Sequence, residues 1–201
     1  PSPNAIRFLS RKEGAVRAEG GKLRYDVESQ VLLVTGVPPR RPFLHVERPG
    51  EKLLAEAERV SFSFREGGIV LEERVEAKVT QKSERAGEHV HRLSAHWVRI
   101  AARTDTGVSS VTARAKDASE PLCLEYDGPP RCRLIGGSLL WERERDVAVG
   151  SPFQGIAAQR IEFLTGELQC RELRFLPAAA KANASGDVTI RLRTEHGELT
   201  I

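Results

Sequence analysis

The stretch that decides the fold runs from Leu23 to Val70 and reads LRYD (23–26), VLLVTGVP (31–38), FLHV (43–46), LLAEAERVSFSF (53–64) and GGIV (67–70). Apolar and polar residues alternate in these short runs, and glycine, proline and charged residues separate them. Such period-2 alternation is typical of half-buried β-strands. The stretch therefore predicts antiparallel strands that are joined by turns.

Comparable runs continue to the end of the chain, for example in Val90–Ile100 and around Val188, Ile190 and Leu192. Strand signals recur at spacings of about 8–12 residues, which favours an all-β sandwich, jelly roll or solenoid. No amphipathic helix of three turns is predicted. The apolar positions change parity near Trp97, which indicates a bulge or a strand break. Residues 1–15 are expected to be an irregular lead-in to one domain that spans residues 16–201.

Part of the stretch is repeated further along the chain. LRYD has a counterpart in LEYD (124–127), and ERVSF (58–62) has one in QRIEF (159–163). Tyr25 and Tyr126 lie 101 residues apart, as do Phe62 and Phe163. A partial third copy, Leu93–Ala115, resembles residues 53–67. A unit of this kind has one apolar face that it cannot bury alone, so the copies must stack or fold over one another. We expect two related halves, about 16–92 and 93–201.

Composition excludes several classes of protein. The chain has 201 residues, 40% hydrophobic and 29% charged, with a formal net charge of +3. These values are typical of a folded domain and not of a disordered one. No apolar run approaches the roughly 20 residues of a membrane helix. Positive and negative residues are interleaved, and no basic stripe with aromatics predicts nucleic-acid binding.

The N-terminus leaves the compartment open. It carries no basic segment followed by an apolar one, so either the chain is cytoplasmic or a signal or anchor was removed. The chain contains no methionine, which favours a processed or excised fragment.

Three cysteines leave two interpretations open. Cys123 and Cys132 are placed symmetrically about Asp127-Gly128, a predicted turn, so a tight hairpin would bring them face to face. They could form a disulfide in an oxidising compartment. Alternatively, Cys123, Cys132 and Cys170 are small buried residues.

Candidate catalytic and metal-binding residues are few. His89 and His91 would point to the same side of a strand, as two metal ligands do, but no carboxylate follows shortly after them and His96 has the other parity. Tyr25-Asp26 and Tyr126-Asp127 fit strand ends followed by turns. No nucleophile elbow, phosphate-binding loop or cofactor motif is present. We therefore predict no metal, no cofactor and no enzyme activity.

A family resemblance follows from the repeated pattern L-x-Y-D…L-x-G-x-P…V…L-x-A-x-x-V/I-x-F…G. It resembles the OstA-like domains of lipopolysaccharide-transport proteins of the LptA and LptC type. The first copy carries it in Leu23, Tyr25, Asp26, Leu33, Gly36, Pro38, Val46, Leu53, Ala55, Val60, Phe62 and Gly67. The second copy carries it in Tyr126, Asp127, Leu134, Gly136, Ile156, Ala158, Ile161 and Phe163, with Gly136-Gly-Ser in place of the glycine-proline step.

The resemblance implies a β-jellyroll shaped as a folded-over antiparallel sheet, or half-open sandwich. It implies a periplasmic protein, with or without a membrane anchor outside this chain, that relays lipopolysaccharide or a similar acyl lipid along an apolar trough. Other β-jellyroll proteins of a transport bridge would dock through edge strands. The residues expected to face the lipid are Leu33, Leu44, Val46, Val60, Phe62, Leu134, Ile156, Ile161 and Phe163.

Two alternatives belong to other functional classes. The first is a structural β-repeat module that mediates only protein–protein assembly by edge-strand stacking. The second is a small metal-dependent enzyme of the cupin kind, which needs His89, His91 and a carboxylate to converge in a barrel mouth. A continuous apolar trough would favour the lipid carrier over both.

Overall fold

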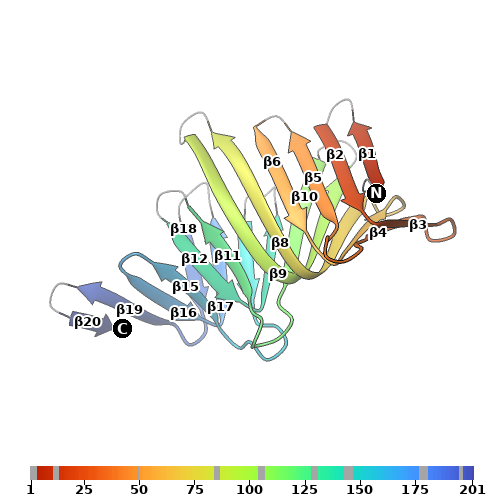
Figure 1. The fold of residues 1–201 in the computed structure, drawn as a ribbon. Helices are drawn as coiled ribbons and strands as arrows, with labels where there is room; N and C mark the ends of the chain where they lie inside the picture. Colours follow the sequence, from red (N-terminus) through yellow and green to blue (C-terminus); the bar gives the residue numbers. More distant parts are fainter. Residues whose placement is uncertain are drawn as a thin grey trace.

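The structure, a computed structural model, describes residues 4–10, 14–48, 50–83, 87–103, 107–127, 131–142, 147–176, 181–194 and 197–201. These residues form β-strands and turns, without a helix, and the strands make one large antiparallel sheet that is not closed into a barrel (Figure 1). The all-β prediction is confirmed, and the open sheet is consistent with a β-jellyroll-like fold.

The sheet is bent so that it has two layers. Strands β8 (Gly68–Ser83) and β9 (Gly87–Arg103) are long enough to take part in both. The first layer has the order β1-β2-β5-β6-β8-β9-β11-β12-β15-β16-β19-β20, and the second has β3-β4-β7-β8-β9-β10-β13-β14-β17-β18.

The remaining strands are short and belong to one layer each. Those of the first layer are β1 (Asn4–Ser10), β2 (Gly14–Gly20), β5 (Phe43–Arg48), β6 (Glu51–Glu56), β11 (Leu122–Tyr126), β12 (Cys132–Gly136), β15 (Gln159–Phe163), β16 (Gly166–Cys170), β19 (Thr189–Thr194) and β20 (Gly197–Thr200). Those of the second layer are β3 (Lys22–Asp26), β4 (Val31–Thr35), β7 (Arg59–Ser63), β10 (Gly107–Arg114), β13 (Ser138–Glu142), β14 (Val147–Ser151), β17 (Glu172–Leu176) and β18 (Lys181–Ser185).

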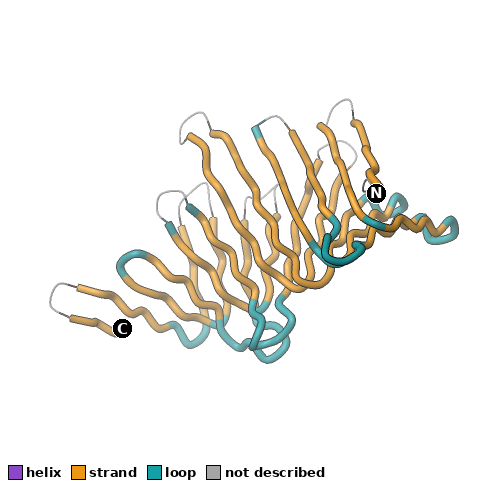
Figure 2. The backbone as a smooth tube through the Cα atoms, viewed as in Figure 1, coloured by secondary structure: helices purple, strands orange, loops and turns teal. Residues whose placement is uncertain are grey.

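The chain alternates regularly between the layers. Two strands pair as a hairpin in one layer, and the chain then passes to the other layer for the next hairpin. We call the line of these passages the crease, and the opposite margin, where the hairpin ends lie, the rim. Crease loops run along the lower side of Figure 2. The crease consists of residues 21, 36–42, 57–58, 73–74, 96, 115–121, 137, 152–158, 171 and 186–188.

A β-bulge makes the passage possible within β8. Glu72 pairs with Trp97 and Val75 pairs with Ala95, so Glu73 and Arg74 together face one residue of β9. Both bulge residues have left-handed backbone angles, with φ of 63° and 49°. Bulges of this kind bend a strand and increase its twist. The irregularity predicted near Trp97 is confirmed, although the extra residue lies in the partner strand.

The expected irregular lead-in at residues 1–15 is wrong. Strand β1 pairs along its whole length with β2, from Asn4 opposite Gly20 to Ser10 opposite Gly14. Two alternating apolar residues, Ile6 and Phe8, are too short a signal on their own, and the pairing with β2 supplies the backbone hydrogen bonds. The expected boundary between two halves, at residues 92 and 93, falls inside β9.

The two copies of the sequence repeat occupy hairpins of different layers. Tyr25 belongs to the hairpin β3–β4, and Tyr126 belongs to β11–β12, five hairpins further along the described chain. Because consecutive hairpins alternate between layers, copies that are five hairpins apart lie in opposite layers. Phe62 in β7 and Phe163 in β15 show the same exchange. The repeated stretch therefore spans more than one hairpin, and its two copies have exchanged layers.

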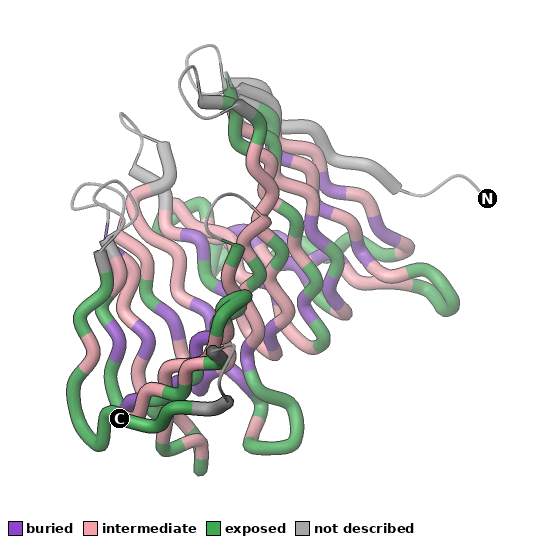
Figure 3. Tube along the Cα trace, turned by 90° about the vertical axis from the view of Figure 1, so that its left-hand side faces the viewer, coloured by how far each residue is buried: buried purple, intermediate pink, exposed green. Residues whose placement is uncertain are grey.

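One hydrophobic core lies between the layers. Ala18 and Leu44 of the first layer and Val34 and Val60 of the second are completely buried. Along most strands buried residues alternate with more exposed ones (Figure 3), as expected when one face of each layer is turned inward. The inward faces of the two layers, which form this core, are the surfaces where a ligand site is expected.

Candidate functional site

The inner face of each layer carries two apolar rows that run across the strands. The row farther from the rim, here called the middle row, contains Ala18, Leu44, Ala55, Ala77, Leu93, Leu124, Leu134, Ile161, Leu168 and Ile190 in the first layer, and Leu23, Val34, Val60, Leu71, Val98, Ala113, Leu139, Gly150, Leu173 and Ala184 in the second. Most of its members are buried.

The row nearer the rim, here called the rim row, is less covered. It contains Val16, Val46, Leu53, Val79, His91, Tyr126, Cys132, Phe163, Gly166, Leu192 and Leu199 in the first layer, and Tyr25, Leu32, Phe62, Ile69, Ile100, Val111, Trp141, Ala148, Phe175 and Ala182 in the second. Many of these side chains are only half-buried, and Phe163 is 40% exposed. The inner face thus becomes progressively more accessible towards the rim.

Seven of the nine residues predicted to face a lipid lie on these rows. The first layer contributes five of them and the second layer two. They are Leu44, Val46, Leu134, Ile161 and Phe163 in the first layer, and Val60 and Phe62 in the second. The structure therefore brings residues from both copies of the repeat to one inner face.

The predictions for Leu33 and Ile156 are wrong. In β4, Leu32 and Val34 are buried on the inner face, and Leu33 between them points outward. The run VLLV has no alternation, so its parity could not be assigned from sequence. Ile156 lies in a crease turn, where its N–H and C=O bond with Phe153 over 3.0 and 3.2 Å. Its side chain packs against the core beside the crease, not on either row.

Sequence reasoning missed several inner residues that the pairing register identifies. Trp141 of β13 pairs with Val111 and Ala148, which places it on the rim row of the second layer. Leu93 pairs with Leu124 on the middle row of the first layer. Once one buried residue of a strand is known, every residue opposite it shares its face. That signal requires the strand partners, which alternation within one strand does not supply.

A cluster of ring side chains interrupts the apolar rim row of the first layer. His91 stacks on Tyr126 with ring centroids 4.9 Å apart, and His89 lies 5.8 Å from the same ring. Burial lowers the pKa of His91, an effect that Asp127 opposes and His89 reinforces. The Asp127 carboxylate accepts a hydrogen bond from the Val90 N–H over 2.6 Å, so it holds the end of β11 against β9.

The histidines do not form the barrel-mouth site of the metal-dependent alternative. His89 and His91 share a face, as predicted, but the sheet is open and His96 lies at the crease. Within the described part of the chain no group of three potential ligand residues is arranged to hold a metal ion. His89 and His91 are therefore better described as hydrogen-bonding side chains on an apolar face.

The proposed pairing of Cys123 with Cys132 is not formed, because the two residues lie on opposite faces. Cys132 pairs with Tyr126 on the inner face, whereas Cys123 lies opposite Ile135 and its sulfur accepts a hydrogen bond from Arg133 Nε over 3.0 Å. All three cysteines are free. Burial raises the pKa of the Cys132 and Cys170 thiols. The hairpin register, which depends on loop length, decides this outcome.

One buried side chain between the layers lacks hydrogen bonds. Gln159 is completely buried, and neither its amide nitrogen nor its amide oxygen has a partner among the described residues. Its side chain lies against Gly136 of the first layer, where a Cβ atom would collide with the amide, and 3.2 Å from the Cβ position of Gly150 in the second. The two glycines provide the space that this side chain occupies.

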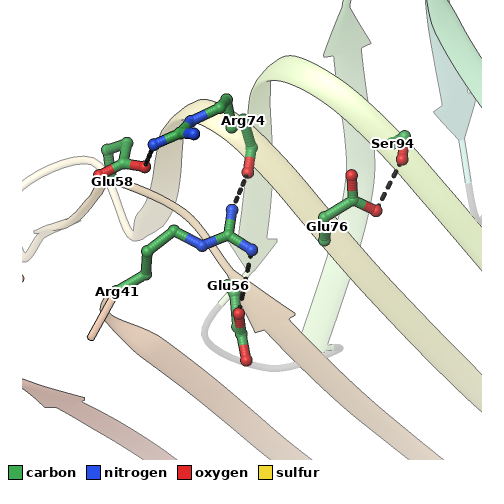
Figure 4. A network of polar contacts seen from close by, with 6 residues as sticks. All are labelled: Arg41, Glu56, Glu58, Arg74, Glu76 and Ser94. Atoms are coloured by element: carbon green, nitrogen blue, oxygen red, sulfur yellow. Dashed lines mark hydrogen bonds and ion pairs between the residues drawn. The ribbon is translucent and has the colours of Figure 1, made fainter. Parts of the chain in front are cut away.

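Charged residues gather at the crease around the β8 bulge (Figure 4). Arg41 donates to the carbonyl oxygen of Arg74 over 2.7 Å and to Glu56 over 3.1 Å, and Arg74 pairs with Glu58. A cleft of about 550 Å³ lies beside them. The interactions join the bulge to neighbouring strands, so the cluster is explained by support of a strained backbone.

The outer faces carry the mixed charge that composition predicts. Arg133 lies between Glu125 and Glu162, at 3.4 and 3.7 Å, across three neighbouring strands. Exposed pairs of this kind contribute little stability, typically about 0–1 kcal/mol each. They make the outer surface polar while the inner face stays apolar.

No family model matches this chain, and a search of curated proteins finds no match to it. Within the described residues there is no helix of the length and hydrophobicity that a membrane crossing requires. The resemblance to OstA-like domains therefore rests on the residue pattern alone.

Proposed function

We propose that this protein is a non-enzymatic carrier of the cell envelope that binds lipopolysaccharide or a similar acyl lipid along its inner face. The observation that supports this most directly is the pair of rim rows. They are mainly apolar in both layers, partly exposed at many positions, and run across the strands of a sheet that is not closed into a barrel. We place the protein in the periplasm on the basis of the family resemblance.

An acyl chain that lies on the rim rows displaces the water that contacts their side chains. Each acyl CH₂ group that is buried against an apolar surface contributes roughly 0.8 kcal/mol. Strands in a sheet lie about 4.8 Å apart, so the eleven strands from β2 to β20 in the first layer present a mainly apolar strip about 50 Å long. A strip of that length accommodates an extended chain and allows it to move from one end of the sheet to the other.

The ends of the sheet support a role within a larger assembly. At one end β1 and β3 are edge strands, and at the other β18 and β20 are, so their outward backbone groups have no strand partner among the described residues. The last inner-face residues at these ends are partly exposed, including Leu23 at 37% and Leu199 at 49%. Strand addition by another β-jellyroll protein would extend the apolar strip. The same edges favour the second candidate function, assembly alone without lipid.

A fluorescence experiment separates these two functions, because the chain has two tryptophans on opposite faces. Trp141 lies on the rim row of the second layer, whereas Trp97 points outward, with the Arg114 guanidinium 4.9 Å from its ring. Trp97→Phe and Trp141→Phe variants each leave one reporter. Brominated dodecanol, a neutral alkyl probe that quenches tryptophan on contact, is titrated below its solubility limit and then displaced with lipopolysaccharide.

We expect quenching of Trp141, reversed by lipopolysaccharide, and little quenching of Trp97. Loss of quenching in a Phe62→Asp variant that still unfolds cooperatively would support the assignment, and Leu33→Asp on the outer face is its matched control. If neither tryptophan is quenched, or if both are quenched alike, the carrier function is refuted. Assembly alone is then the better account, and sedimentation of Leu199→Asp against the unmodified chain tests it.

A further inference from the structure

The inner face of the first layer is not uniformly apolar. His91 and Tyr126 lie next to each other on the rim row, with Val79 on one side and Cys132 on the other. His89 lies one position nearer the rim on the same strand and the same face. These residues occur about half-way along the layer, so an amphiphile that lies on the rim row would meet them with apolar surface on either side.

The cluster offers three hydrogen-bond donors and carries no carboxylate of its own. Each neutral imidazole has one N–H, the Tyr126 hydroxyl has one O–H, and a protonated imidazole has two donors. Nε2 of His89 is buried and has no partner among the described residues. Asp and Glu are absent from both rows of both layers as defined above, and the Asp127 carboxylate, whose charge acts on His91, accepts a hydrogen bond from the Val90 N–H.

We propose that His89, His91 and Tyr126 bind the oxyanion of an amphiphile, a carboxylate or a phosphate, whose acyl chain lies on the adjoining rim row. This inference rests on the proposed function and specifies the chemistry of the ligand. An oxyanion can accept hydrogen bonds from all three side chains at once, and hydrogen bonds to a charged group are the stronger kind. The acyl chain supplies the apolar contact that a free ion does not have.

The same arrangement bears on the protonation of His91. The groups that face His91 are His89 on its own strand, Val79 and Gln81 on β8, and Tyr126 with Asp127 on and after β11. Burial holds the pKa of His91 below its ordinary value, and a bound anion favours the charged form. Binding of the anionic amphiphile should therefore be accompanied by proton uptake at His91.

The experiment compares three brominated probes of equal chain length through Trp141 quenching in the Trp97→Phe background. Dodecanoate and dodecyl phosphate carry an oxyanion, and dodecanol does not. We expect the anionic probes to bind about tenfold more tightly than dodecanol, because a hydrogen bond to a charged group is worth roughly that factor. Acetate and inorganic phosphate, added as competitors, test whether a free anion is sufficient.

The decisive variants are His91→Gln combined with His89→Gln, and Tyr126→Phe. Each should reduce the preference for the anionic probes over dodecanol several-fold, and dodecanol that still binds shows that the inner face is intact. His45→Gln on the outer face of the same layer should change neither affinity. Proton uptake, measured by calorimetry in buffers of different ionisation enthalpy, should disappear with the histidines.

The outcomes are distinguishable. If no probe binds, the carrier function fails and this inference with it. If dodecanol binds as tightly as the anionic probes, or if the double histidine variant keeps the preference, the carrier function stands and the oxyanion site is refuted. Full competition by inorganic phosphate at the concentration of the probe would show a free-anion site and would overturn the assignment to an amphiphile.

Discussion

Replacing Gln159 with leucine should stabilise the protein. The side chain is completely buried, and its amide nitrogen and oxygen have no hydrogen-bond partner among the described residues. A buried polar group without partners costs about 1–3 kcal/mol, and leucine has a similar volume without that polarity. Fitting a branched side chain between Gly136 and Gly150 offsets part of the gain, since imperfect shape costs up to roughly 1.5 kcal/mol. We therefore expect the unfolding free energy to rise by about 1–2 kcal/mol.

Urea denaturation followed by tryptophan fluorescence measures the change. For a domain of this size, each kcal/mol corresponds to about 2–4 °C in Tm, so thermal unfolding provides a second measurement. Gln169→Leu, on the exposed outer face of β16, is the matched control and should change stability by about 0.5 kcal/mol or less. A loss of more than about 1 kcal/mol in Gln159→Leu would refute the reasoning. It would show that the amide is hydrogen-bonded, for example to an internal water molecule.

A double-mutant cycle tests the same packing independently. Gly136→Ala would drive a Cβ atom into the Gln159 amide and should destabilise the protein by about 1–3 kcal/mol. In a Gln159→Ala background most of that penalty should vanish, because the obstructing atoms are gone. Equal effects of Gly136→Ala in both backgrounds would contradict the contact.

Three further predictions concern the inner face, a crease turn and pH. In urea unfolding, Leu32→Ala should lower the unfolding free energy by about 2–4 kcal/mol and Leu33→Ala by about 1 kcal/mol or less, because adjacent residues of β4 lie on opposite faces. Equal losses would contradict the inner-face assignment. Gln154→Asn should raise stability by about 0.5–1 kcal/mol. The reason is that φ at this position is 42° and the next residue is a glycine with φ of 83°, a turn that asparagine-glycine suits. A lower Tm in thermal unfolding would count against the turn type. Burial lowers the pKa of His91 below its ordinary value near 6.5, so its contribution to stability is present above about pH 6.5 and is lost as the pH falls towards the lowered pKa. His91→Gln should therefore lose less stability than the unmodified chain between about pH 7.5 and about pH 5.5, and identical pH dependence would exclude this residue as the source.

Much of the fold could be predicted wherever strict alternation was visible. Val60 and Phe62 alternate with serines, and both lie on inner rows, as expected from the period of two in a strand. Alternation failed at Leu33 because four apolar residues in succession carry no parity. It also failed for residues 4–10, where the signal is short and the pairing with β2 supplies the missing stability. The candidate site was predictable in outline, as an apolar face, but not in its polar centre.

The amino-acid sequence by itself determined that the chain is all-β, that its strands carry one apolar face, and that a short unit is repeated. These are local properties, since alternation, turn residues and spacing act between near neighbours in the chain. Tertiary structure decided which strands pair, and through that register it placed Cys123 and Cys132 on opposite faces and His91 against Tyr126. It also decided that copies of the repeat lie in opposite layers, because each hairpin buries its apolar face only against a hairpin from the other layer. The half-buried rim rows are a property of that arrangement and of no single strand.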